Sequence, residues 1–382
     1  MQKGSGALSG SPPPPCAWPA AAGVPLPLVA DPVGVYRPRH PERTSFYQIL
    51  EDHFQDYLWA YEERFEPRSG PLRPVVPPTV EAFLACGRLQ GGFARIRCPS
   101  CKGEHLLAFS CQTRNVCPSC QAKRAALLAE RLTEEILAPV PHRHFVFSIP
   151  RALRGLFQRE RSLLGLLSQT AHAAILRCFQ AVLARDDVRP GVVASLQTFG
   201  RFAANFHPHL HAMVSEGAFT DQGEFLPLPS MDVRVIEEVF RRLLLHRLRR
   251  AHRLSEEFHR KLLSWHPSGF SVHAEQVVAP HEPERLARLV RYLVRPPVAM
   301  GRVSRTPEGR ARVRTPSHPR TGERQELLDP LEWIHRLALQ IPDPRQHTLP
   351  TTAPTPTASA APCSAPPGTP RPLPHPLHSR PR

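Results

Sequence analysis

Three histidines in the sequence have the spacing to bind a metal ion from one side of a β-strand. Residues 207–211 read His-Pro-His-Leu-His. Side chains alternate between the two faces of a strand, so His207, His209 and His211 would share one face. Neutral imidazoles on one face, followed by the apolar residues 212–214, can hold a divalent metal ion. The pattern therefore predicts a metal site on this strand.

A group of cysteines has the spacing of a zinc site. Two CxxC pairs, separated by fifteen residues, are formed by Cys98, Cys101, Cys117 and Cys120. Each pair directs two thiolates toward one centre, so we expect a structural zinc ion. Cys111 and Cys86 are candidates for an extra ligand. A redox pair is the alternative use of a CxxC motif, but the repeated Cys-Pro-Ser-Cys favours zinc.

One of the five tyrosines, Tyr292, follows the histidine pattern in the chain. It lies near the end of an expected basic helix, beside Arg291 and Arg295. The histidine pair resembles the metal-binding mark of the HUH single-strand endonucleases, and this resemblance implies a tyrosine nucleophile. A phenol, whose ordinary pKa is about 10, attacks a phosphodiester only if the phosphate is polarised. Packing of the ring on a sheet is the structural alternative. Arg291 and Arg295 are candidates for binding DNA phosphates, and so are Lys123 and Arg124 beside the second CxxC pair.

The composition agrees with a polyanionic partner. The chain has 382 residues, with 49 Lys and Arg against 33 Asp and Glu, and a net charge of +16. This balance indicates a nucleic-acid partner. A GC-rich genome, which favours Arg over Lys, is the alternative cause of the basic charge. A hydrophobic content of 41% excludes a wholly disordered chain. No apolar run approaches the roughly 18 residues of a membrane span. We expect a cytoplasmic, bacterial-type, nucleoid-associated protein.

The elements that must position these residues follow an α+β pattern. Helical spacing of apolar residues predicts helices over 44–64, 80–86, 121–137, 156–184, 232–264 and 282–293. Strands are predicted over 144–150, 192–199, 207–214 and 270–278. We therefore expect a mostly antiparallel sheet with flanking helices, preceded by a small helical zinc-binding domain. The Arg-rich residues 301–324 are expected to form a solvated loop or a guide for single-stranded DNA.

Four segments together resemble the insertion sequence ninety-one type transposases, which include the ISCR-like elements. They are residues 86–124, 141–154, 196–219 and 270–299. The resemblance implies a zinc-binding domain holding Zn²⁺ and then an HUH domain, named for its His-hydrophobic-His pair. It implies that His209 and His211 hold Mg²⁺ or Mn²⁺. It also implies that Tyr292 cuts one DNA strand and keeps its 5′-phosphate in rolling-circle-like transposition.

The resemblance also bears on partners and domain limits. Its implied partner is single-stranded DNA at the element ends, with no membrane and no small-molecule substrate. HUH sites usually use a third metal ligand, and the candidates are Gln197, His273, Glu275 and His207. We predict a disordered lead over 1–43, a zinc-binding domain over 44–138 and an HUH domain over 139–347. A disordered Pro-rich tail follows over 348–382, which holds eleven of the 46 prolines.

The chain departs from the family pattern in two places. Members with two tyrosines carry the second one four residues before the first, where this chain has Arg288. The chain therefore resembles the single-tyrosine branch. Residues 341–347 still resemble the family, whereas the tail over 348–382 does not. We hypothesise that a frameshift produced this tail.

Two other functions fit part of the pattern. A catalytically inactive remnant, acting only as a zinc-dependent DNA-binding protein, would share every cysteine and basic feature. A hydrolytic metalloenzyme built on the histidine strand would need a carboxylate beside the motif to activate water. Pro208, Leu210 and Ala212 occupy those positions, which argues against hydrolysis.

Overall fold

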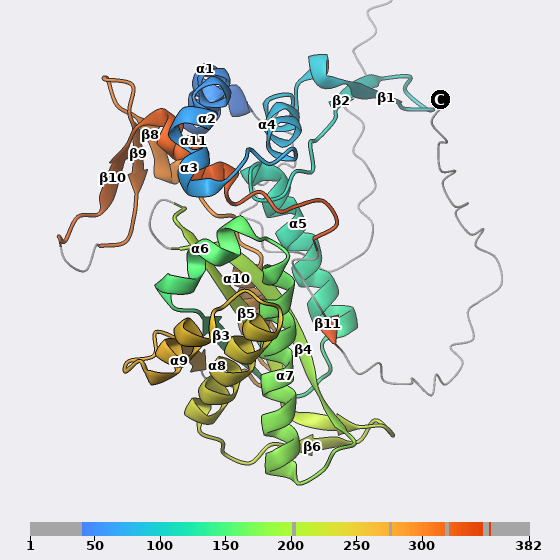
Figure 1. Cartoon of the computed structure of the whole chain (residues 1–382). Helices are drawn as coiled ribbons and strands as arrows, with labels where there is room; N and C mark the ends of the chain where they lie inside the picture. Colours follow the sequence, from blue (N-terminus) through green and yellow to red (C-terminus); the bar gives the residue numbers. More distant parts are fainter. Residues whose placement is uncertain (1–39, 201–203, 275–276, 318–320, 347–350, 353–382) are drawn as a thin grey trace, which may run out of the picture.

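The computed structural model describes residues 40–200, 204–274, 277–317, 321–346 and 351–352 (Figure 1). Most of the predicted lead (1–43) and tail (348–382) lies outside these ranges, as does Glu275. None of the described helices is both long and apolar enough to cross a membrane.

The central element is an antiparallel sheet, as predicted. Its strands run in the order β11, β4, β5, β3 and β7, and β6 pairs with β5. Their bounds are His142–Ser148 for β3, Val188–Phe199 for β4, Phe206–Thr220 for β5, Phe225–Pro227 for β6, Ser271–Ala274 for β7 and Thr351–Thr352 for β11. The predicted strands are thus present, and β4 and β5 are longer than the alternating pattern indicated.

Four helices lie on one side of this sheet. They are α6 (Arg151–Arg159), α7 (Leu163–Leu183), α8 (Val233–Arg250) and α9 (Glu256–Ser264), drawn in green and gold in Figure 1. Leu210 and Ala212 of β5 belong to the apolar core on this side, and so does Phe147 of β3. Because β5 alternates, His209 and His211 must face the opposite side.

Two helices cover the opposite side of the sheet. They are α5 (Pro118–Arg131), extended by one π-helical turn, η3 (Leu132–Ile136), and α10 (Pro283–Leu293). Val193 and Met213 of the sheet pack there against Val290 and Leu293 of α10. The polar residues of the sheet therefore lie under the two helices that carry the basic and tyrosine candidates.

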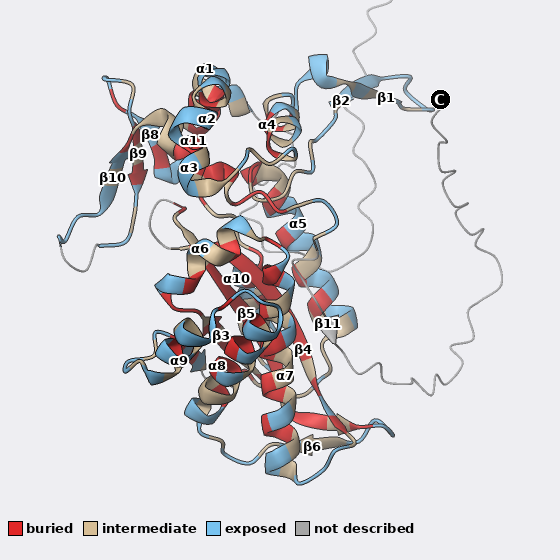
Figure 2. Cartoon of the chain, in the orientation of Figure 1, coloured by how far each residue is buried: buried red, intermediate tan, exposed pale blue. Residues whose placement is uncertain are grey.

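A second core joins the two ends of the described chain. It contains α1 (Ser45–Trp59), α2 (Tyr61–Arg64), α4 (Val76–Leu84), α11 (Pro330–Ala338) and a small sheet of β8 (Val303–Arg305), β9 (Ala311–Arg314) and β10 (Gln325–Leu328). The short helix α3 (Glu66–Ser69) joins α2 to α4 and has no buried residue. Trp333 of α11 is fully buried, and its ring lies 6.0 Å from that of Phe46 in α1. Figure 2 shows buried stretches, in red, on both α1 and α11. The limits predicted at 44–138 and 139–347 stay a prediction, but residues from both ranges share this core.

The expectation of a solvated loop is wrong for part of the Arg-rich residues 301–324, while a role as a guide for single-stranded DNA stays a prediction. Much of this segment lies in β8, β9 and their short turn, and β10 follows. Val303 and Val313 are paired and buried, but isolated valines between arginines do not reveal an apolar strand pattern. The hairpin of β1 (Phe93–Arg97) and β2 (Glu104–Ala108) was not predicted either. Its strands are short and largely exposed, so they show no buried apolar face.

Truncating Trp333 tests the core that the two ends share. Trp333→Ala should lower the free energy of unfolding by about 3–5 kcal/mol, the usual cost of emptying an aromatic site in a core. Urea denaturation followed by circular dichroism measures this change. Trp59→Ala is the matched control, because Trp59 is 75% exposed on α1. Equal losses in the two variants would contradict the shared core.

Candidate active site and metal centre

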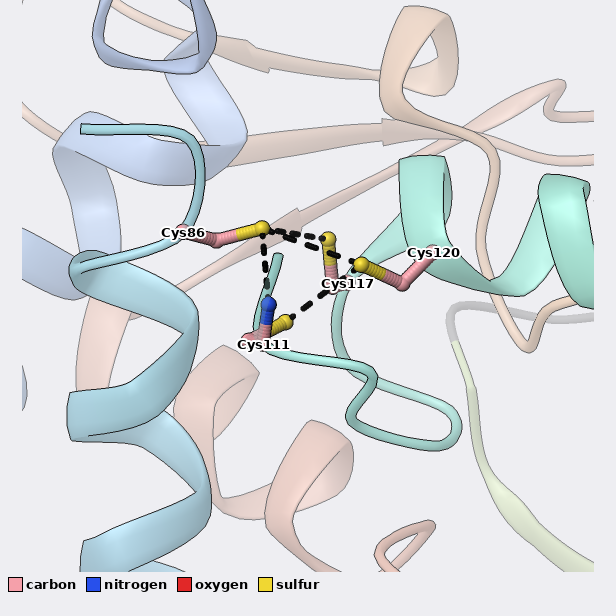
Figure 3. Close-up of side chains that lie close together, drawn as sticks. All are labelled: Cys86, Cys111, Cys117 and Cys120. Carbon is pink, nitrogen blue, oxygen red and sulfur yellow. Dashed lines mark hydrogen bonds between the residues drawn. The ribbon is translucent and has the colours of Figure 1, made fainter. Parts of the chain in front are cut away.

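Four cysteines converge between α4 and the start of α5 (Figure 3). They are Cys86, Cys111, Cys117 and Cys120. Cys86 follows the end of α4, while Cys117 is the N-cap residue of α5 and Cys120 lies one turn later. Pro118 occupies the first turn of α5, which suits a helix start.

The sulfur atoms have the spacing that zinc requires. Cys86 Sγ lies 3.7 Å from Cys120 Sγ and 3.8 Å from Cys117 Sγ, and Cys111 Sγ lies 3.6 Å from Cys120 Sγ. Four sulfurs at about 2.3 Å from a tetrahedral zinc ion would lie about 3.8 Å apart. Hydrogen bonding among the four thiols lowers the pKa of Cys111 and Cys120 and raises that of Cys86 and Cys117, as expected of thiols that share protons in one cluster. The cluster therefore fits a structural zinc site.

Two members of this cluster differ from the set that CxxC spacing favoured. Cys117 and Cys120 meet Cys86 and Cys111, which the sequence offered only as extra ligands. Cys98 and Cys101 instead lie at the turn of the β1–β2 hairpin, where the amide of Cys98 donates to the carbonyl of Gly103. Zinc binding by these two residues stays a prediction.

The histidines predicted on one strand lie in β5 as expected. His209 stands opposite Gln197 of β4 and Ser148 of β3, and His211 stands opposite Ser195 and Val146. Directly opposite residues in a sheet share a face. This face therefore carries two histidines and their polar neighbours beneath α10.

Both histidines use Nδ1 within the protein. His209 Nδ1 lies 2.8 Å from the carbonyl oxygen of His207, which can only accept, so Nδ1 carries the proton. His211 Nδ1 lies 3.0 Å from Nε2 of His144 in β3. His211 Nε2 is buried and has no hydrogen-bond partner among the described residues. A neutral imidazole held in this way offers Nε2 to a metal ion.

Burial keeps these imidazoles neutral. It lowers the pKa of His209 to about 4, with the nearby charge of Arg295 as a further cause. Burial also lowers the pKa of His211 far below its ordinary value, together with His209 and His144. Each ring is therefore uncharged at neutral pH, with one nitrogen protonated and the other keeping a lone pair for a metal ion.

Tyr292 lies over this face at the end of α10. Its ring centroid lies 5.3 Å from that of His211 and 6.2 Å from that of His144, in both cases edge to face. The side chain is 40% exposed, so a substrate can reach it. The guanidinium of Arg295 lies 4.2 Å above the ring.

Side chains of β4 hold the end of α10 in place. Gln197 Nε2 donates to the carbonyls of Tyr292 and Leu293 at 3.2 and 2.9 Å, and Ser195 Oγ donates to that of Leu293 at 2.5 Å. From α5, Gln121 Nε2 donates to the carbonyl of Val294 at 2.8 Å. We call residues 111–131, which hold three of the four clustered cysteines and include α5, the zinc-binding segment. Through Gln121 this segment contacts the turn that follows Tyr292.

The candidates for a third ligand lie at different places around the pair. Gln197 adjoins His209, and its Oε1 is buried without a partner among the described residues. His207 instead contacts Arg154, with 3.0 Å between His207 Nε2 and Arg154 Nη2. His273 lies on β7, opposite Val146.

The sequence reasoning missed His144, whose strand neighbours gave no sign that β3 lies beside β5.

The predicted DNA-binding side chains lie on two helices and the turn after α10. Lys123 and Arg124 are exposed on α5, and Arg291 is exposed on α10. Arg295 is half-buried in the turn that follows α10. All four therefore lie on the side of the sheet that carries His209.

Comparison with known proteins agrees with these two sites. Residues 191–350 match a family model described as "Putative transposase", and residues 49–149 match one described as "Transposase zinc-binding domain". Over 320 residues the chain is 30% identical to "Putative transposase y4qJ" of Sinorhizobium fredii, covering 76% of each chain. The chain belongs to the IS91-type transposases.

A second relative of the transposase is the "Transposase for insertion sequence element IS801" of Pseudomonas savastanoi pv. phaseolicola. The two are 27% identical over 300 residues, which cover 72% of this chain and 69% of the relative. No solved structure matches the chain. The recognition of an IS91-type transposase with an N-terminal zinc-binding domain is confirmed.

Serine substitutions decide which cysteines hold zinc. Cys86→Ser should reduce the zinc bound per chain and lower the melting temperature, because one of four sulfurs is lost. Metal analysis and a thermal melt measure both quantities. Cys178→Ser is the matched control, since Cys178 is buried on α7, outside the cluster. If Cys98→Ser removes this zinc and Cys86→Ser does not, the four-cysteine centre is wrong.

Proposed function

We propose that this transposase nicks and rejoins single-stranded DNA through a covalent bond to Tyr292. The observation that carries the proposal is the placement of an accessible tyrosine ring beside two buried, neutral histidines. The phenol oxygen would attack the scissile phosphorus, and the bond from phosphorus to the 3′ oxygen would break. The products are a 5′-phosphotyrosine and a free 3′-hydroxyl group.

The histidine pair supports a divalent metal site, and we propose Mg²⁺ or Mn²⁺. When bound, such an ion supplies Lewis acidity to a phosphate oxygen. His209 and His211 would hold it through Nε2, because their Nδ1 atoms are engaged elsewhere. The orphaned, buried Nε2 of His211 fits this role.

Gln197 is the third ligand that we favour. Among the described residues, the cysteine centre is the one group of three or more His, Cys, Asp or Glu side chains arranged to hold an ion. Neither His207 nor His273 therefore completes a site with the histidine pair in this arrangement. Gln197 has a buried amide oxygen without a partner in the described chain, next to His209.

Other residues would act on the DNA and on the tyrosine. Arg295 places a positive charge on the face of the Tyr292 ring, where a scissile phosphate would also arrive. Arg291, Lys123 and Arg124 would bind neighbouring phosphates, since they are exposed on the same side. Donors held ready at the place where negative charge develops stabilise a transition state.

Tyr292→Phe tests the nucleophile. The full chain is incubated with Mn²⁺ and single-stranded DNA from the ends of its element, and denaturing gels are examined for a protein–DNA adduct. The wild type should form the adduct and Tyr292→Phe should form none, because the attacking oxygen is absent. Tyr61→Phe removes a hydroxyl bonded to the carbonyl of Gly70, far from this chemistry, and should keep the adduct. An adduct in Tyr292→Phe would overturn the assignment, and no adduct in the wild type would favour an inactive DNA-binding remnant.

Substitution of His144 tests how His211 is oriented. His144→Leu removes the acceptor for His211 Nδ1–H and should weaken Mn²⁺ binding about tenfold, the lower end for loss of such a partner. His144→Gln retains an acceptor and should restore much of the affinity. Titration followed by electron paramagnetic resonance measures free Mn²⁺ without DNA. His172→Leu on α7 is the control, and equal affinities in His144→Leu and His172→Leu would refute the role of His144.

A further inference from the structure

A cavity of about 240 Å³ lies between the zinc-binding segment and the sheet, next to the tyrosine. Its lining includes Arg114 and Arg124 from the zinc-binding side and Arg295 from the turn after α10. Gln197 lines it as well and also belongs to the polar face under α10. The cavity therefore adjoins the polar face that carries the histidine pair.

The charge of this cavity is one-sided. Three of its lining side chains are guanidinium groups, and no lining residue is acidic. Within the described ranges, Arg114 donates to the backbone carbonyls of Gln346 and Asp343, at 2.7 and 3.3 Å, and forms no ion pair with a carboxylate. Arg124 forms no hydrogen bond or ion pair with a residue in the described ranges. Like charges gathered around a cavity favour the entry of an anion.

The three arginines of the cavity also lie near one another and near Tyr292. Burial lowers the pKa of Arg114, and the charge of Arg124, which lines the same cavity, lowers it further. Arg295, the third guanidinium group of the lining, lies 4.2 Å from the centroid of the Tyr292 ring, and that ring lies 5.3 Å from the ring of His211. The positive charge of the cavity therefore extends to the side of Tyr292.

We propose that this cavity binds one phosphate of the DNA strand, next to the phosphate that Tyr292 attacks. The zinc-binding segment supplies Arg114 and Arg124, and the turn after α10 supplies Arg295. Both parts of the transposase would therefore contact the same DNA strand. That the anion is a DNA phosphate rests on the proposed function. A DNA strand lies beside the cavity only if Tyr292 acts on DNA. A phosphate held by several guanidinium groups is a common and strong contact in nucleic-acid complexes.

The first test compares two arginines of one helix in the full chain. Both are changed in the Tyr292→Phe background, so that no cleavage disturbs binding of a fluorescent single-stranded element end. Arg124→Gln should raise Kd about tenfold, the effect of losing one charged hydrogen bond, and should lower the salt slope. Arg131→Gln removes the same charge from α5, but Arg131 pairs with Glu135, and its Kd should change little. Equal Kd values for the two variants would overturn the proposal.

The second test identifies the phosphate. Each phosphate of the oligonucleotide is replaced in turn by an uncharged methylphosphonate. One replacement should weaken binding to the parent protein and leave binding to Arg124→Gln unchanged, because coupled partners are not additive. If every replacement weakens both proteins equally, the cavity binds no DNA phosphate.

The two proposals fail in different ways. A tyrosine-dependent adduct without any coupling between Arg124 and a phosphate removes the cavity proposal and leaves Tyr292 as the nucleophile. Coupling without an adduct supports the cavity as a phosphate site while removing the nucleophile. Arg124 is exposed, so its substitution leaves the fold intact, and a thermal melt verifies this.

Discussion

The buried carbonyl groups at the end of α10 decide where the tyrosine lies. A helix leaves its last carbonyls without partners inside the helix, and each buried carbonyl left unpaired costs about 1–3 kcal/mol. Ser195 and Gln197 of the sheet satisfy Leu293, and Gln121 of α5 satisfies Val294. The same bonds hold the ring of Tyr292 above His211. The polar residues of β4 thus secure the helix as well as furnish the site.

The cysteine centre helps to position the turn after α10, although it does not contact Tyr292 itself. It fixes the first turn of α5, and that helix then delivers Gln121 to the turn after α10. Its residue Cys117 also belongs to the core built around Trp333. The centre therefore lies between the shared core and the histidine face. Cys117 belongs to the first, and α5 connects the centre to the second through Gln121.

Much of the site was predictable because it depends on local periodicity. Alternation along one strand brought His209 and His211 to one face, and helical spacing placed Tyr292 at a helix end. Residues that meet only through tertiary contacts were harder to predict. His144 joins the site because β3 pairs with β5, and Cys86 joins the cysteines because α4 ends beside α5. Spacing favoured Cys98 and Cys101 because nearness in sequence is all that a CxxC pattern reports.

The shared core has a consequence for the order of synthesis. Phe46 and Tyr57 emerge from the ribosome early, yet Trp333 and His335, which contact them, emerge near the end of the described chain. Every strand of the central sheet except β11 has been made once β7 is complete, whereas the first helices must wait for α11 to cover them. During this interval their aromatic faces stay open to chaperones or to other chains. A message cut short before α11 would yield a nearly complete sheet attached to helices that cannot close.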